Sequence, residues 1–249
     1  MGIFEDLGAE QERLEKILAG LDEKQWLSGS GAAGWTIADV VLHLAQSEDA
    51  VVATATRGSL RGGLGAPGSD RAGETMDERA AEAVRMERAA PAEVFARWQR
   101  ARQEALDALR AADPDQPVAW VAAPVKPATL ATTRLAEHWA HGLDITGPLA
   151  LEFPDTERLR HVAWLAHRTL PYALMLAGEP PAQVRCELTA PDGGSVWQFG
   201  PPEAESAITG TAGDFCRVAA RRLAPADSGL TASGPHGATA LRLMRTYAE

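Results

Sequence analysis

The stretch that decides the fold is RLAEHWAHGLD, residues 134–144, because four of its polar side chains recur at helical spacing. At about 100° per residue, one face of a helix carries all four within roughly 80° of one another. They are Arg134, Glu137, His141 and Asp144. This polar stripe has two interpretations: a solvated helix face held by Arg–Glu and His–Asp pairs, or a ligand site. The i, i+4 placement of Glu137 and His141 favours the second, since both side chains can reach one metal ion, as in the cores of helical bundles.

A third ligand is available in the apolar run IADVVLHL, residues 37–44, which contains His43. Taken alone, a histidine in such a run is more often a hydrogen-bonded core residue than a ligand. Two histidines and one carboxylate with an open position, however, form the ligand set of a catalytic zinc ion or a related divalent ion. The sequence therefore predicts His43, Glu137 and His141 as the ligands of one divalent metal.

Five further side chains are candidates for supporting roles around this site. Asp144 is predicted to orient the imidazole three residues before it or to pair with a neighbouring cation. Arg134 is predicted to pair with the carboxylate three residues after it, and neither residue is expected to bind the metal. His138 lies beside the stripe and could compete as a ligand, but it is predicted to border the pocket, where it could contact substrate, or to lie on the surface. Arg168 and Tyr172 share a helical face and could hold a substrate carboxylate, although a structural role is the simpler interpretation.

The N-terminal part of the sequence has helical periodicity, and its boundaries carry recognisable signals. Thr36, with Asp39 three residues later, is a capping-box-like start, and Thr129 is the predicted cap of the helix that carries the stripe. Residues 58–73 hold six glycines and a proline, which predicts a surface loop, either a lid or a plain linker. The predicted helices span residues 3–20, 36–57, 74–112 (a short helix, then a long one with Pro91 in its first turn), 129–146 and 156–176.

In the last third of the sequence, the long helical periodicity gives way to short strand patterns joined by turn residues. The tight-turn sequence Asp192-Gly193-Gly194 predicts a hairpin between strands at 184–191 and 195–199. A third strand at 207–210, a helix capped by Thr211 and running to residue 222, and a closing helix at 238–248 are also predicted. The predicted fold class is α+β: a four-helix bundle over residues 1–150 followed by a small α/β domain over residues 151–249.

Composition excludes several classes of function. With 24 Lys plus Arg against 34 Asp plus Glu, the net charge of −10 disfavours nucleic acid and anionic membranes as partners. The two cysteines, Cys186 and Cys216, are too few and too far apart for a disulfide framework or a thiolate zinc site. The sequence begins without a signal-peptide pattern and has no apolar run long enough to span a bilayer, so a cytoplasmic protein with a small-molecule substrate is expected. The oligomeric state is left open.

The Gly34-Trp35-Thr36 start, with His43 seven residues after Thr36, and the Arg-x-x-Glu-x-x-x-His-x-x-Asp pattern of residues 134–144 resemble the DinB/YfiT-like metal-binding superfamily. The similar branch is the two-domain actinobacterial group that includes mycothiol-dependent maleylpyruvate isomerase. The resemblance implies a DinB-like bundle followed by a sterol-carrier-like domain, and zinc bound by His43, Glu137 and His141.

The resemblance leaves three functions to weigh, because a shared metal site does not transfer a substrate. The leading hypothesis is a metal-dependent transferase or isomerase that activates a low-molecular-weight thiol, which the resemblance implies is mycothiol, toward a small electrophilic metabolite. The alternative is a thiol-independent metal-dependent hydrolase, lyase or cyclase of specialised metabolism. The third is a small-molecule binding protein without catalysis.

Overall fold

The computed structural model describes residues 2–57, 75–120 and 123–246. The chain separates into two compact units, one ending at Phe153 and the other beginning at Pro154. No helix within the described ranges is long and apolar enough to cross a membrane. The glycine-rich stretch predicted as a loop, residues 58–73, lies outside the described residues.

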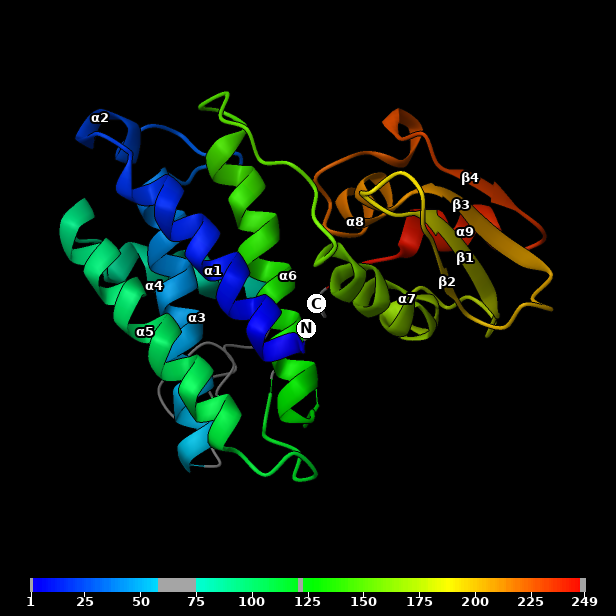
Figure 1. The fold of residues 1–249 in the computed structure, drawn as a ribbon, viewed down its shortest axis with the longest axis horizontal. Helices are drawn as coiled ribbons and strands as arrows, with labels where there is room; N and C mark the ends of the chain where they lie inside the picture. The colour runs from blue at the N-terminus through cyan, green and yellow to red at the C-terminus, as the bar shows by residue number, and fades with distance from the viewer. Residues whose placement is uncertain (1, 58–74, 121–122, 247–249) are drawn as a thin grey trace. The chain divides into compact units, whose positions relative to one another are not determined.

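The N-terminal unit is built from helices. Four long ones pack alongside one another, as Figure 1 shows, and two shorter ones join them. The long helices are α1 (Ile3–Ala19), α3 (Ile37–Arg57), α5 (Pro91–Ala111) and α6 (Pro127–Thr146), and the short ones are α2 (Glu23–Trp26) and α4 (Met76–Met86). Helix α3 contacts α2, α4, α5 and α6, which explains why its sequence is apolar on most sides.

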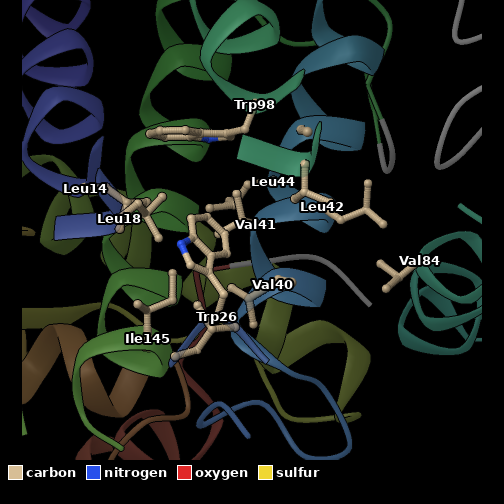
Figure 2. Close-up of a cluster of buried hydrophobic side chains, with 14 residues drawn as sticks. Leu14, Leu18, Trp26, Val40, Val41, Leu42, Leu44, Val84, Trp98 and Ile145 are labelled. Carbon is tan, nitrogen blue, oxygen red and sulfur yellow. The ribbon is translucent and has the colours of Figure 1, made fainter. Parts of the chain in front are cut away.

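The core of this unit lies around α3 (Figure 2). Its buried side chains come from all six helices described in this unit, and each of the long helices contributes an apolar face. Labelled members are Leu14, Leu18, Trp26, Val40, Val41, Leu42, Leu44, Val84, Trp98 and Ile145. Close packing of these side chains fixes the axial position of α3 against α6. That position determines which polar side chains of the two helices meet.

The C-terminal unit contains a four-stranded sheet in the order β2-β1-β3-β4. Strand β1 pairs with β2 in the antiparallel hairpin that the turn sequence predicted, and with β3 in parallel, while β4 pairs with β3 in antiparallel. Helices α8 and α9 each pack on α7, and all three helices contact the sheet. The bounds are β1 (Val184–Thr189), β2 (Val196–Phe199), β3 (Ser206–Thr211), β4 (Thr231–Ser233), α7 (Leu159–Leu176), α8 (Ala212–Ala219) and α9 (Gly237–Leu243). The predicted α+β class is confirmed.

Several element boundaries differ from the prediction. Helix α6 begins at Pro127, so Thr129 is not its cap, because proline is well suited to the first turn and needs no hydrogen-bonded N–H there. Helix α9 ends at Leu243 rather than at residue 248, and α8 ends at Ala219. The sequence analysis missed the single-turn α2 and the three-residue β4, both too short to show a period.

The predicted start of α3 is confirmed. The backbone N–H of Asp39 donates to Oγ1 of Thr36 at 3.1 Å, and the N–H of Thr36 donates to Oδ2 of Asp39 at 3.0 Å. This reciprocal pair is a capping box, which satisfies two backbone donors at the helix start.

Candidate metal centre

The structure brings His43 of α3 together with Glu137 and His141 of α6. One ligand atom from each of these three side chains lies within 4.8 Å of the others. The Nε2 atom of His141 is 3.5 Å from Oε2 of Glu137, because the two residues are one helical turn apart. The imidazole rings of His43 and His141 have centroids 5.2 Å apart and planes at 73°. Two helices therefore present two nitrogens and one carboxylate to one point.

His43 fits the role of a ligand. Its Nδ1 atom is buried and has no hydrogen-bond partner among the described residues, so His43 is not held as a hydrogen-bonded core histidine. Burial, the charge of His141 and that of Arg134 lower the pKa of His43 to about 3, although Glu137 acts in the opposite direction. The ring is therefore neutral at pH 7, the protonation state in which imidazole binds a metal.

His141 is oriented by the acid predicted for that task. Its Nδ1 atom is 2.9 Å from Oδ2 of Asp144, which leaves Nε2 facing Glu137. Burial would lower the pKa of His141, but hydrogen bonds with Asp144 and Glu137 and the charges of both carboxylates raise it instead. A carboxylate behind an imidazole in this manner fixes the ring and makes it a better ligand.

Glu137 is held in its ionised form. Burial would raise its pKa, but the hydrogen bond with His141 and the charges of His141, Arg134 and His43 outweigh it and hold the pKa well below its usual range. The carboxylate is therefore available as a ligand at any pH near neutrality. Taken together, the donor set fits a divalent ion such as zinc.

Arg134 does not form the ion pair that the sequence predicted. Its Nε donates to Oε1 of Glu48 on α3 at 2.9 Å, and its influence on Glu137 is through charge. The sequence analysis missed Glu48, which is wholly buried. A signal was present, since Glu48 occupies the buried stripe of α3 between Leu44 and Val51 at spacings of four and three residues. An acid in such a stripe needs a cation opposite it.

His138 does not lie at a pocket rim or on the surface, so that prediction is wrong. Its ring is completely buried. Nε2 accepts a hydrogen bond from Nε1 of Trp98 at 3.2 Å, so Nδ1 carries the proton and donates to the carbonyl oxygen of Arg134 at 2.9 Å. Burial and the charge of Arg134 lower the pKa of His138 to about 3, which keeps the ring neutral. His138 is thus a satisfied core histidine.

The two other candidates are on α7 in the C-terminal unit. Arg168 and Tyr172 are both exposed and lie one turn apart on the same side of that helix. The segment before α3 also contacts the candidate centre. The ring of Trp35 lies 5.2 Å from that of His43, and the N–H of Gly31 donates to the carbonyl oxygen of Asp144 at 2.7 Å.

Comparison with known proteins shows the family to which this chain belongs. The model of the mycothiol maleylpyruvate isomerase N-terminal domain matches residues 7–146, more than half of the chain and all of the segment that carries the three candidate ligands. The chain belongs to this family. Two members from Mycobacterium tuberculosis, in strains H37Rv and CDC 1551, are each 33% identical over 246 residues, covering 98% of this chain and 94% of theirs. Both are described as uncharacterized proteins.

Solved structures show the same fold over nearly the whole chain. The crystal structure of mycothiol-dependent maleylpyruvate isomerase has a TM-score of 0.61 at 17% identity, covering 93% of this chain and 91% of that one. A histidine-to-alanine mutant of that enzyme gives a TM-score of 0.62 at 16% identity with the same coverage. At this identity, the likeness establishes the fold, and the chemistry of this family member has to be argued from its own residues.

Proposed function

We propose that this chain is an enzyme in which zinc or a related divalent ion is held by His43, Glu137 and His141 and activates a low-molecular-weight thiol. The thiol would attack a small electrophilic metabolite, leading to its isomerisation or to thiol transfer. The observation that carries the proposal is the convergence of these three side chains within 4.8 Å, with the buried Nδ1 of His43 left without a partner. Family membership makes mycothiol the first thiol to test.

Within this proposal, the side chains of the centre have separate tasks. A divalent cation held by His43, Glu137 and His141 would supply a Lewis acid that lowers the pKa of a nearby thiol. Glu137, kept ionised by its neighbours, provides negative charge to the cation, and Asp144 holds the ring of His141 with Nε2 toward the centre. Burial keeps His43 neutral, so that no proton has to leave it before a cation binds.

The protein's own thiols do not compete for the role of nucleophile. Cys186 and Cys216 belong to the C-terminal unit, and both are completely buried. Burial raises the pKa of Cys186 to about 12 and that of Cys216 well above its ordinary value, so both stay protonated at pH 7. A thiol-dependent reaction at the candidate centre would therefore use an added thiol.

The test combines the metal-loaded protein with mycothiol and a panel of conjugated or strained electrophiles, maleylpyruvate among them, and identifies products by mass spectrometry. Each reaction is repeated without thiol and with His141→Ala. Turnover or adduct formation that requires both the thiol and an intact centre supports the proposal. Full turnover without any thiol would overturn it in favour of a hydrolase, lyase or cyclase, and ligand binding without turnover of any compound would favour a binding protein.

A further inference from the structure

The loop before α3, residues 28–36, contacts α6 at Asp144. The N–H of Gly31 donates to the carbonyl oxygen of Asp144 at 2.7 Å. The approach is so close that a Cβ added at Gly31 would lie 3.0 Å from Cα and 3.1 Å from Oδ1 of Asp144. Only a glycine fits at this point without displacing one of the two segments. The 28–36 loop is thereby fixed against the residue that orients the imidazole of His141.

The same loop contacts the second imidazole through Trp35. The ring centroids of Trp35 and His43 are 5.2 Å apart with planes at 54°. His141 has a carboxylate behind it, whereas Nδ1 of His43 has no hydrogen-bond partner among the described residues. Metal-binding histidines are usually oriented by such a hydrogen bond. For His43, packing against the indole of Trp35 takes that place.

The loop that joins these two contacts is itself held by hydrogen bonds. The carbonyl oxygen of Trp35 accepts from both the N–H and the Oγ–H of Ser30, each at 2.9 Å. The N–H of Trp35 donates to the carbonyl oxygen of Ala32 at 3.1 Å. The N–H of Ile37 donates to the carbonyl oxygen of Ser28 at 3.0 Å, which closes the loop at its base. Gly31 and Trp35 are therefore fixed relative to each other.

We infer that the 28–36 loop is a positioning device for both imidazoles of the metal centre: Gly31 holds Asp144, which orients His141, and Trp35 orients His43. The inference rests on the metal centre of the proposed function, but not on the thiol or the substrate. Gly31 and Trp35 are positioning residues in this account, since each acts on the metal through another side chain.

Two glycines of the same loop provide a matched test. In Gly31→Ala the new methyl group must displace Asp144 or the loop, whereas a Cβ at Gly29 meets nothing within 4 Å. We expect Gly31→Ala to weaken Zn²⁺ affinity by roughly ten- to a hundredfold, the range seen when the groups that orient metal ligands are lost. Gly29→Ala should leave the affinity unchanged. Affinity is measured by chelator competition on the full-length protein.

A second pair of variants separates ring orientation from lost packing. Trp35 and Phe95 are both partly buried and pack on the same core. Trp35→Leu should weaken Zn²⁺ affinity and alter the visible absorption spectrum of the Co²⁺-loaded protein, which reports the ligand geometry. Trp35→Phe should retain much of the Zn²⁺ affinity and of the Co²⁺ spectrum, because it keeps an aromatic face toward His43. Phe95→Leu should lower the melting temperature while leaving affinity and spectrum unchanged.

The outcomes distinguish this inference from the function on which it rests. If the unmodified protein binds Zn²⁺ and Gly31→Ala binds as tightly as Gly29→Ala, the positioning role of Gly31 is overturned while the metal centre stands. Equal effects of Trp35→Leu and Phe95→Leu on the affinity overturn the role of Trp35. An unmodified protein that binds neither Zn²⁺ nor Co²⁺ overturns the metal centre and the inference with it. Dependence of turnover on thiol is measured separately and does not bear on the positioning roles of Gly31 and Trp35.

Discussion

Arg134 of α6 donates from Nε to Oε1 of Glu48 on α3 at 2.9 Å, and both side chains are buried. Nη2 of Arg134 and Oε2 of Glu48 have no hydrogen-bond partner among the described residues. Burial raises the pKa of Glu48, and the charge and hydrogen bond of Arg134 only partly offset this. The pair thus joins the two helices that carry the three candidate ligands, and each charge depends on the other.

Removing one member of this pair should be costly. Arg134→Met leaves the carboxyl group of Glu48 buried without a partner, and we expect a loss of about 3–5 kcal/mol in the free energy of unfolding, measured with urea. The double variant Arg134→Met/Glu48→Met should recover most of the loss, because no buried charge is left. Arg85→Met, which breaks an exposed pair with Glu82, is the control and should change stability little. An equally small effect of Arg134→Met would contradict the argument.

Metal content should depend on both histidines. His43→Ala and His141→Ala each remove one of three protein ligands, and the chelate that remains is poor. We expect each purified variant to lose most of its bound metal, measured by inductively coupled plasma mass spectrometry. His161→Ala, which changes a histidine of α7 in the C-terminal unit, should retain full content. Full metal occupancy in both of the first two variants would disprove the assignment.

Asp144 should tune the affinity without providing a ligand. Asp144→Asn keeps an oxygen that can accept from Nδ1 of His141 but removes the negative charge behind the ring. We expect the Zn²⁺ affinity to fall by roughly ten- to a hundredfold, with binding still saturable. Chelator competition measures the change. Complete loss of binding would instead identify Asp144 as a ligand.

Asp39 should make the stability depend on pH in the acid range. Burial would raise its pKa, but hydrogen bonds with Arg88 and Thr36 and the charge of Arg88 lower it below the ordinary value of 3.8. The ionised form is thus favoured in the folded state, so this contribution is fully present above about pH 5 and is lost as the pH falls through 3.8 and below.

The corresponding experiment compares Asp39→Asn with the unmodified protein by urea unfolding at pH 6 and at pH 3. The variant should be less stable by about 1 kcal/mol at pH 6, the order of the net contribution of one hydrogen bond, and this difference in stability should narrow at pH 3. Arg88→Gln removes the guanidinium whose Nε donates to Oδ1 of Asp39 at 2.8 Å, and this variant should show a weaker dependence of stability on pH. A gap that widens at pH 3 would reverse the sign of the linkage.

Much of the secondary structure was predictable because it depends on local periodicity. The helices near residues 3–20, 36–57 and 129–146 and the hairpin around Asp192-Gly193-Gly194 follow from apolar spacing, capping residues and turn residues. Short elements such as β4 were not predictable, since three residues are too few to show a pattern and a strand depends on the neighbour with which it pairs.

The sequence by itself determined that Glu137 and His141 share one helix face with Asp144, because an α-helix brings residues three and four apart together whatever surrounds it. Only the tertiary structure decided the partners of α6 across the bundle. Glu48 meets Arg134 across 86 positions of sequence, and Gly31 reaches Asp144 from a loop outside any regular element. Such contacts depend on the rotation and the axial shift of one packed helix against another. The dense core around α3 fixes both of these quantities, and no local spacing encodes them.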